Sequence, residues 1–397
     1  KQKPTPYDEA VSLIWYLEHV LYHSVSTIYN FVQQHIYDGE VLNNEIIDLG
    51  FWPGGDRDGN PFVTTEITLK VAERLRQTIL KNYHKDIRKL RRRLTFKGIE
   101  EILIRIEKRL NKHITKSYKV VNFSSKILLE ELIKARVILT EEHKSLFIEE
   151  LDDLIHKVSI FGFHFATLDI RQDSRIHHNA FTKMVEELLD TKDTTFPSNY
   201  LTLSEAEQVT VLSEIKGDID PNLFSDDMLV KTLKSIQAIK EIQYRNGKRG
   251  ANRYIISNNQ TALNVMQTFA MLNLSGFGET LPVDVIPLFE TVDDLQNAES
   301  VMRTLYANPS YRKHVSQRKD KQTVMLGFSD GTKDGGYLMA NWSIFKAKEA
   351  LTAISREFGI EVIFFDGRGG PPARGGGKTH QFYASLGPTI EDKEIQL

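Results

Sequence analysis

The sequence predicts an α/β protein in which a parallel sheet is joined to a large helical region. Three observations carry this prediction. Up to about residue 160, apolar residues recur at spacings of three and four, as on amphipathic helices. After it, short β-branched or aromatic runs alternate with helical patterns, which favours strand–helix repeats and a parallel sheet. Charged and glycine-rich residues follow these runs directly. We therefore expect residues 1–160 to be mainly helical, with one early strand near 45–52, and residues 161–397 to hold the other strands and the loops that carry the chemistry.

Helical periodicity is clearest in four segments. They are residues 7–36, 64–94, 98–114 and 141–162. Thr64 or Thr65 is suited to cap the second segment, because a threonine hydroxyl can accept a hydrogen bond from a free backbone N–H of the first turn. The basic end of this segment, Lys85–Arg93, raises the question of a nucleic-acid contact. We favour a solvated helix face, because the total charge is close to neutral. Residues 190–221 are polar and are expected to be loop with short helices.

Six apolar runs are candidate strands. They are EIIDLGF (45–51), FHFATLDI (163–170), RYIIS (253–257), VDVIPLF (283–289), TVMLGF (323–328) and EVIFF (361–365). Polar stretches such as WPGGDRDGN, ETVDD, SDGTKD and DGRGG follow them. A (β/α) barrel builds its active site in this way, from loops at the carboxyl ends of its strands. A doubly wound open sheet also binds ligands at strand ends and stays the alternative.

Four cations are predicted to converge on these strand ends. Arg368 and Arg374 lie in FFDGRGGPPARGGGKTH, a stretch with little that could pack a core. Glycine lets a ligand approach the main chain, and arginine offers a planar set of donors to phosphate or carboxylate. Arg171 and Lys333 follow other strands, so the four charges would repel one another unless an anion lay among them. For Arg171 a buried ion pair with Asp169 is the alternative.

Two carboxylates, Glu290 and Asp330, are predicted at neighbouring strand ends. One or two carboxylates, completed by water and substrate, suit Mg²⁺ or Mn²⁺. As alternatives, Glu290 could cap the helix that follows it and Asp330 could belong to a turn. Cations beside a carboxylate-bound metal predict a substrate that carries phosphate and carboxylate together. The glycine-rich stretch is neither a P-loop nor a dinucleotide fingerprint.

Composition narrows the class of protein further. The formal charge is −2, from 51 basic and 53 acidic residues, so no overall field points to nucleic acid or to a membrane surface. The absence of cysteine excludes disulfides, thiolate metal sites and a cysteine nucleophile, and it fits a cytoplasmic location. We find no apolar run of ~18 residues and no signal peptide. The chain starts without methionine and stops abruptly at EDKEIQL, which suggests a piece of a longer protein.

Five motifs closely resemble those of the phosphoenolpyruvate carboxylase family, in order and in approximate spacing. They are GGDRDGNPFVT, LDIRQDS, PLFETVDDL, MLGFSDGTKDGG and DGRGGPPARGGGKTH, and the resemblance runs from about Leu49 to the end of the chain. It implies a bacterial-type enzyme with a helix-rich (β/α)₈ TIM barrel, of which this chain would hold strands 2 to 7. The barrel would therefore be incomplete, with the N-terminal and C-terminal parts outside the chain.

The resemblance also implies an activity and roles for particular residues. The family converts phosphoenolpyruvate and bicarbonate to oxaloacetate and phosphate with Mg²⁺ or Mn²⁺, an anaplerotic carbon fixation that feeds the tricarboxylic acid cycle in the cytoplasm. The matching positions are Arg171, Arg368 and Arg374 for substrate phosphate, Lys333 for catalysis near bicarbonate, and Glu290 and Asp330 for the metal. Arg374 also matches an arginine thought to respond to an acidic feedback inhibitor. The full-length enzyme would be a homo-oligomer, expected to be a tetramer.

Two departures from the family pattern matter. The family's essential histidine lies in a Thr-Ala-His-Pro-Thr-Glu segment, which this sequence does not contain, so we expect the chain alone to be inactive. Asp366 stands where many relatives have histidine. Two other functions remain as alternatives. One is another phosphoenolpyruvate-handling barrel enzyme, such as a mutase or kinase relative. The other is a non-catalytic helical interaction module that uses the basic helix around Arg91.

Overall fold

The fold comes from a computed structural model that describes residues 3–37, 46–115, 123–367 and 377–397. The chain divides into two compact units. The helical unit consists of Lys1–Gly55, Phe62–Asp169 and Ile239–Asn252. The sheet unit consists of Asp56–Pro61, Ile170–Ala238 and Arg253–Leu397. A short stretch from the first part of the sequence thus belongs to the sheet unit.

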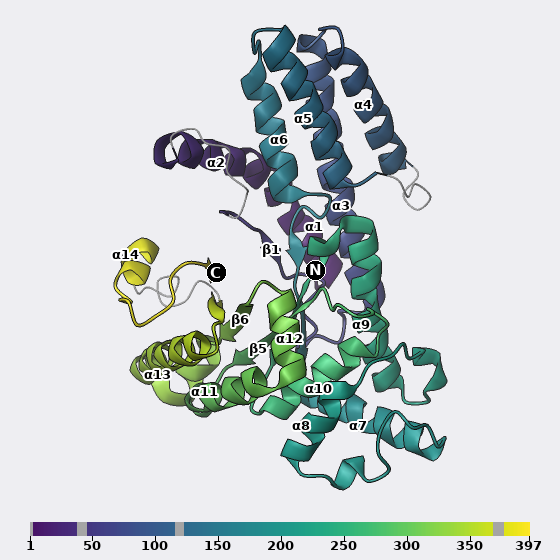
Figure 1. Cartoon of the computed structure of the whole chain (residues 1–397), viewed down its shortest axis with the longest axis vertical. Coiled ribbons are helices and arrows are strands. Elements are labelled where there is room, and N and C mark those ends of the chain that lie inside the picture. Colours follow the sequence, from purple (N-terminus) through teal and green to yellow (C-terminus); the bar gives the residue numbers. More distant parts are fainter. Residues whose placement is uncertain (1–2, 38–45, 116–122, 368–376) are drawn as a thin grey trace. The chain divides into compact units, whose positions relative to one another are not determined.

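The helical unit contains six α-helices among its described residues (Figure 1). These are α1 (Pro6–Tyr16), α2 (Tyr22–Ile36), α3 (Thr65–Arg93), α4 (Ile99–Thr115), α5 (Ser125–Glu142) and α6 (Ile148–Phe161), with a π-helical turn η1 (Leu17–Leu21) between α1 and α2. The unit also includes the 3₁₀ turn η4 (Lys248–Gly250) and a two-stranded parallel sheet of β1 (Gly50–Phe51) and β2 (Thr167–Leu168). Strand β1 lies in the range where the sequence predicts an early strand.

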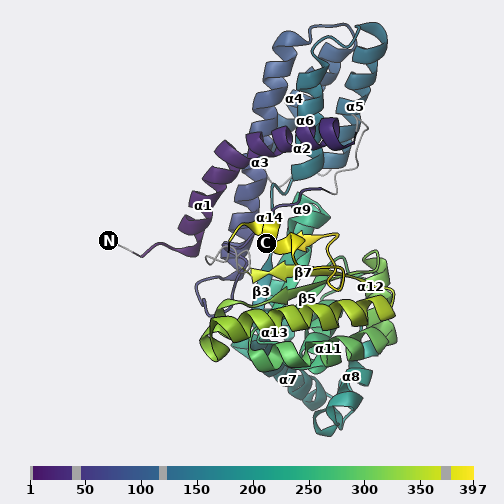
Figure 2. The same cartoon turned by 90° about the vertical axis from the view of Figure 1, so that its left-hand side faces the viewer.

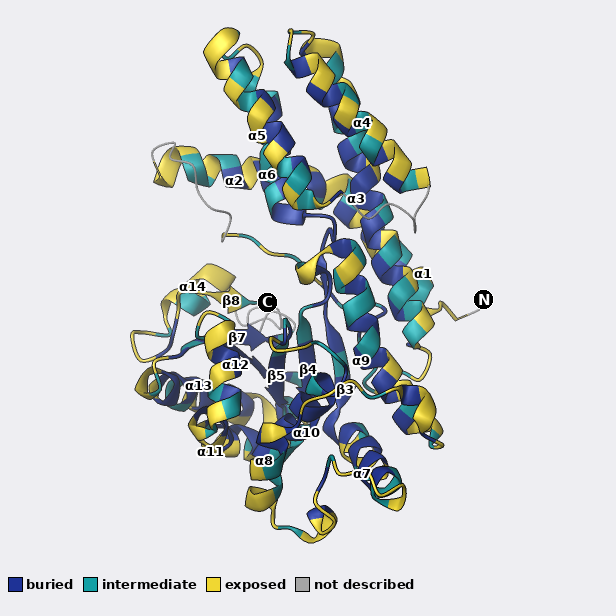
Figure 3. Ribbon diagram, turned by 45° about the vertical axis from the view of Figure 1, so that its right-hand side comes forward, coloured by how far each residue is buried: buried dark blue, intermediate teal, exposed yellow. Residues whose placement is uncertain are grey.

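Local sequence explains where these helices begin and which side they bury. Thr5 and Asp8 form a capping box at the start of α1, and Pro6 occupies the first helical turn, where no intrahelical N–H bond is lost. Thr64, one of the two predicted caps, accepts from the Ile67 N–H at the start of α3. Each long helix then buries one apolar side, visible as dark blue positions along the ribbons in Figure 3.

The sheet unit contains six strands and the helices that connect them. The strands are β3 (Ile170–Asp173), β4 (Arg253–Ser257), β5 (Asp284–Phe289), β6 (Lys321–Leu326), β7 (Glu361–Asp366) and β8 (Ile395–Gln396). The helices are α7 (Ser174–Asp190), α8 (Glu205–Glu214), α10 (Ala262–Asn273), α11 (Val292–Ala307), α12 (Pro309–Gln317), α13 (Ser329–Glu357) and α14 (Thr379–Ala384), with 3₁₀ turns η2 (Tyr200–Thr202) and η3 (Pro221–Leu223). Helix α9 (Asp227–Asn246) begins in the sheet unit and ends in the helical unit.

The strands of the sheet unit lie in their order along the chain, and every neighbouring pair is parallel. Figure 2 shows helices α11 and α13 together on one side of this sheet. A doubly wound sheet reverses its strand order at a switch point, and no reversal occurs among these strands. The doubly wound alternative is therefore wrong. The broader prediction of a helix-rich α/β protein with parallel strands is confirmed.

Four features differ from the sequence prediction. Residues 163–170 do not form one strand, since β2 ends at Leu168 and β3 begins at Ile170 in a different sheet. Residues 141–162 do not form one helix, because Lys144, Ser145 and Phe147 have positive φ angles, which end helical geometry before α6. Strand β8 and helix α5 were not among the predicted elements. Among the described helices, none is long and apolar enough to cross a bilayer.

Two buried histidines of the sheet unit predict a loss of stability in mild acid. Burial lowers the pKa of His177 to about 3 and that of His314 to about 4. Below about pH 6.5 the unfolded chain therefore binds protons that the folded chain does not, and each histidine removes about 1.4 kcal/mol of unfolding free energy per pH unit until its folded pKa is reached. Urea unfolding between pH 7.5 and 5 should show this loss. In His177→Gln the free energy of unfolding should depend less on pH. Substitution of the exposed His35 should leave its pH dependence unchanged.

Candidate active site

The candidate active site lies at the carboxyl ends of the strands in the sheet unit. Arg171 belongs to β3, Glu290 directly follows β5, and Asp330 and Lys333 lie in the first turns of α13, just after β6. Parallel strands in one sheet present their carboxyl ends along the same edge. These four predicted residues therefore gather at one edge of the sheet. Arg368 and Arg374 lie outside the described residues, and their roles stay predictions.

Arg171 is held by carboxylates from two other parts of the chain. Its guanidinium forms an ion pair with Asp58 and lies 3.7 Å from an Asp56 oxygen and 3.6 Å from Glu290 Oε1. The backbone adds a contact, because Arg57 N–H donates to the Arg171 carbonyl at 2.9 Å. Burial alone would lower the pKa of Arg171, but the three carboxylates outweigh burial and raise it. The arginine stays charged in a largely buried place.

Glu290 is available to the site and does not cap helix α11. That cap is Thr291, whose hydroxyl accepts from the Asp294 N–H at 3.1 Å. Glu290 Oε2 instead accepts from the Asn258 N–H at 2.6 Å, after strand β4. Burial raises the pKa of Glu290, while the Asn258 hydrogen bond and Arg171 oppose this rise. The helix-cap alternative for Glu290 is thus wrong.

Asp330 and Lys333 form an exposed pair beside Glu290. Lys333 Nζ lies 2.8 Å from Asp330 Oδ1, and their side chains are 77% and 47% exposed, respectively. Such a surface pair contributes little energy, so either group can exchange its partner for a ligand. The turn after β6 packs closely on Glu290, because a Cβ at Gly327 would lie 3.1 Å from the Glu290 Cα. The absence of a side chain at Gly327 therefore allows this close approach.

The charges of the described site are mixed and not only cationic. Four carboxylates (Asp56, Asp58, Glu290 and Asp330) surround two cations (Arg171 and Lys333). Asp56 and Asp58 escaped the sequence prediction, although they stand in the quoted GGDRDGN motif. The available signal was their place directly after an early predicted strand, which is the criterion that selected Glu290 and Asp330. Arg171 therefore has counter-ions before any anionic ligand binds.

Possible metal ligands are few. Within the described ranges, no group of three or more histidine, aspartate or glutamate side chains is arranged to hold a metal ion. Glu290 and Asp330 remain as a pair whose charges are close enough to influence each other. Mg²⁺ is commonly held by one or two carboxylates, with water and substrate oxygens in the other positions. This pair fits Mg²⁺ or Mn²⁺ coordinated in that way.

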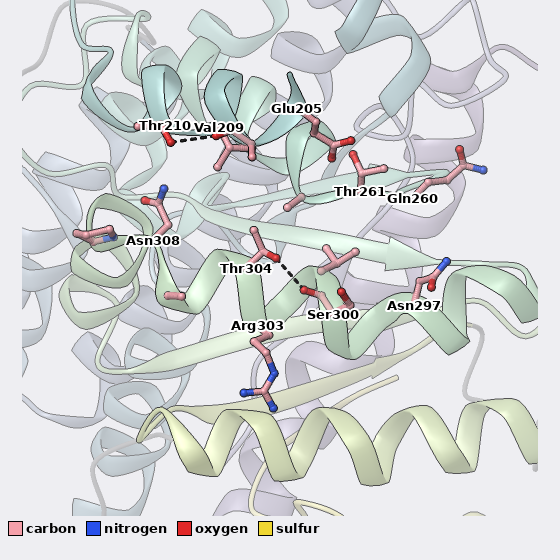
Figure 4. Close-up of a pocket in the computed structure, with 15 residues that line it drawn as sticks. Glu205, Val209, Thr210, Gln260, Thr261, Asn297, Ser300, Arg303, Thr304 and Asn308 are labelled. Atoms are coloured by element: carbon pink, nitrogen blue, oxygen red, sulfur yellow. Dashed lines mark hydrogen bonds between the residues drawn. The ribbon is translucent and has the colours of Figure 1, made fainter. Parts of the chain in front are cut away.

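A large pocket of the sheet unit lies elsewhere. It has a volume of 820 Å³ and is lined by residues of α8, α11 and the start of α10, as Figure 4 shows. None of the four strand-end residues lines it. Arg303 at its edge is already bound to Glu299 at 2.9 Å and to Glu357 at 2.8 Å. We therefore place the candidate site at the charged residues of the strand ends and not in this larger pocket.

Most cations at the basic end of α3 pair with carboxylates within the helical unit. Arg91 pairs with Glu107, and Arg93 pairs with Glu150. Lys85 lies 3.2 Å from Glu18. These pairs support the interpretation of this segment as a helix face, and they weigh against an interaction module built on the cations around Arg91.

Comparison with known proteins identifies the family. The family model described as phosphoenolpyruvate carboxylase matches residues 1–126 and 100–389. A phosphoenolpyruvate carboxylase of Nitrosomonas eutropha is 30% identical over an alignment of 446 positions, which includes 99% of this chain and 47% of the relative. Those of Nitrosomonas europaea and Rhodothermus marinus are 30% and 28% identical, over 99% and 100% of this chain and 47% and 48% of the relatives. The chain thus spans about half the length of these curated relatives. It belongs to the phosphoenolpyruvate carboxylase family.

Proposed function

We propose that this chain supplies the central part of an enzyme that converts phosphoenolpyruvate and bicarbonate to oxaloacetate and phosphate. The observation that carries the proposal is the meeting of Glu290, Asp330, Arg171 and Lys333 at the ends of neighbouring parallel strands. A substrate with both phosphate and carboxylate needs cations for its negative charges. Such a substrate also suits a carboxylate-bound divalent ion.

Each residue has a distinct proposed role. Arg171, together with Arg368 and Arg374, binds the phosphate of the substrate or of its products, because a guanidinium fork matches phosphate oxygens. Lys333 lies near bicarbonate and stabilises its charge during carboxylation. Glu290 and Asp330 hold Mg²⁺ or Mn²⁺, which when bound supplies stabilisation for negative charge on the enol oxygen of the substrate. When Glu290 and Asp330 turn to the metal, Lys333 loses its partner and Arg171 keeps Asp56 and Asp58 as its remaining carboxylate partners.

The wider features of the family complete the proposal. The strand order, in sequence and without reversal, is that of a (β/α)₈ barrel, and we propose that the described sheet is part of such a barrel. The full-length protein works in the cytoplasm as a homotetramer and supplies oxaloacetate to the tricarboxylic acid cycle. An acidic feedback inhibitor would compete for Arg374.

A coupled assay for oxaloacetate tests this function. The full-length natural protein should form oxaloacetate and phosphate from phosphoenolpyruvate and bicarbonate when Mg²⁺ is saturating. The 397-residue chain alone should show no turnover, because it lacks the histidine-containing segment of the family. Rearranged substrate without released phosphate would point to a mutase, and pyruvate as the main product would point to another phosphoenolpyruvate-handling enzyme. Either product would contradict the proposal.

The metal assignment predicts a specific loss of Mn²⁺ affinity. In the full-length protein, Asp330→Asn should weaken Mn²⁺ binding about tenfold, because a charged oxygen ligand is lost. The matched control is Asp334→Asn. Asp334 lies one turn further along α13 and accepts a hydrogen bond from the Val292 N–H at 3.1 Å, which an amide oxygen can also accept. Water-proton relaxation by Mn²⁺ measures both affinities, and an unchanged affinity in Asp330→Asn would remove the assignment.

A further inference from the structure

The backbone of one residue, Asn258, links Glu290 to two other elements of the sheet unit. Asn258 directly follows strand β4, and its N–H donates to Glu290 Oε2 at 2.6 Å. Its carbonyl accepts from the Ser174 hydroxyl at 2.6 Å. Ser174 is buried, begins helix α7 and stands three residues after Arg171 in the sequence. Asn258 therefore connects the carboxyl ends of β3, β4 and β5.

Asn258 has an uncommon backbone conformation. Its φ angle is 51°, in the left-handed region, where glycine, asparagine and aspartate are tolerated best and a β-branched side chain is strained. A residue held in this region costs free energy, and such residues gather where the surrounding structure or the function requires them. At Asn258 this conformation presents the N–H to the carboxylate that follows β5.

Other left-handed residues of the sheet unit have a local role. Lys192, Lys319 and Asp320 also have positive φ angles. Each follows a helix closely, and its N–H donates to a carbonyl three to five residues earlier, which ends that helix. Asn258 instead follows a strand, and its partners are side chains 32 and 84 residues away. A local turn therefore does not explain the contacts of Asn258.

The hydrogen bond from Asn258 distinguishes the two oxygens of Glu290. Oε2 is held by the Asn258 N–H, and a hydrogen bond to a charged carboxylate is stronger than one between neutral groups. Oε1 lies 3.6 Å from Arg171 Nη2, beyond hydrogen-bonding distance. The backbone thus fixes one oxygen of the carboxylate and, with it, the direction in which the other points.

We propose that Asn258 and Ser174 are positioning residues for Glu290 as a metal ligand. This inference rests on the proposed function, because it takes Glu290 to bind Mg²⁺ or Mn²⁺. Ser174 holds the carbonyl of Asn258, and the left-handed backbone of Asn258 then holds the Glu290 carboxylate. The carboxylate is thereby kept from closing on Arg171. A ligand that is oriented in advance loses less conformational entropy when the ion binds.

Two substitutions of Asn258 test its backbone conformation through Mn²⁺ affinity. In the full-length natural protein, Asn258→Val should weaken Mn²⁺ binding about tenfold, because valine disfavours the left-handed region and turns the N–H away from Glu290. Asn258→Gly should stay within about threefold of the unmodified protein, because glycine adopts this conformation readily. Water-proton relaxation by Mn²⁺ measures both affinities. Unchanged affinity in Asn258→Val would overturn the inference, and so would an equal loss in Asn258→Gly.

Lys192→Val is the matched control for backbone strain. Lys192 has a φ angle of 60°, and its N–H donates to the Leu189 carbonyl at 3.0 Å, after the end of α7. Its substitution by valine should lower the melting temperature as Asn258→Val does, but it should leave Mn²⁺ affinity unchanged. An equal loss of Mn²⁺ affinity in the two valine variants would mean a general effect of lower stability, which would overturn the inference.

The role of Ser174 has its own test. Ser174→Ala frees the Asn258 carbonyl and should weaken Mn²⁺ binding about threefold. The control is Ser213→Ala, which removes another buried serine hydroxyl, one that donates to the Val209 carbonyl at 2.9 Å within α8. This control should bind Mn²⁺ as the unmodified protein does. Equal Mn²⁺ affinities in the two alanine variants would overturn the role of Ser174.

Mn²⁺ binding and turnover together separate this inference from the proposed function. If the unmodified full-length protein binds Mn²⁺ but makes no oxaloacetate, the proposed function fails. The difference in Mn²⁺ affinity between Asn258→Val and Asn258→Gly would still support the positioning of Glu290. If the unmodified protein does not bind Mn²⁺ at all, the inference is overturned together with the metal assignment.

Discussion

Replacing Arg171 by methionine is expected to lower kcat/KM for phosphoenolpyruvate by about 1,000-fold in the full-length protein. Two losses combine in this variant. The substrate phosphate loses a guanidinium donor, and Asp56, Asp58 and Glu290 lose the cation that they share. Because Arg171 is only 18% exposed, the uncompensated carboxylates should also lower the unfolding free energy by about 3 kcal/mol.

Two further variants show whether the effect belongs to this guanidinium. Arg171→Lys keeps the charge but not the planar fork, so it should restore most of the stability and less of the activity. Arg175→Met is the matched control. Arg175 pairs with Asp173 at 2.5 Å but is 75% exposed, so its loss should change kcat/KM by less than about threefold. Normal kinetics in Arg171→Met with a large fall in stability would show that Arg171 is only a structural counter-ion.

Replacing Arg368 by lysine is expected to lower kcat/KM about 30-fold, or about 2 kcal/mol, with almost no change in melting temperature. Lysine keeps the charge but acts as a point donor, whereas two parallel N–H donors of arginine bind a phosphate. The glycine-rich sequence around Arg368 predicts little packing of its side chain, so we expect stability not to depend on it. This combination is the opposite of the one expected for Arg171, where activity and stability fall together.

The control for Arg368 is Arg303→Lys. Arg303 binds both oxygens of Glu357 at 2.8 and 3.1 Å, so the substitution removes a similar forked interaction away from the strand-end site. Its kcat/KM should change less than about twofold. Steady-state kinetics and thermal unfolding of both variants provide the comparison. A lowered melting temperature with normal kinetics in Arg368→Lys would assign that arginine to the fold and not to anion binding.

Local pattern was enough to predict most elements of the sheet unit. Strands β4, β5, β6 and β7 coincide closely with apolar runs in the sequence, because a strand buried on both faces needs apolar residues throughout. The cap of α3 at Thr64 was predictable for a similar reason, since it depends on groups within one helical turn. Strand β8 was not, because two residues are too few to show a period.

The sequence by itself determined which residue types stand at the strand ends, and hence Glu290, Asp330, Lys333 and Arg171 as candidates. Only the tertiary structure decided how they are paired. Asp58 reaches Arg171 from more than a hundred residues away, and Asp366 meets Lys348 and Tyr383 across three elements. No local pattern in the sequence predicts which distant residues meet, because these contacts follow from the way strands and helices pack. The same limit hid the counter-ions of Arg171, so the sequence predicted a cluster of cations where the described fold has mixed charges, with more carboxylates than cations.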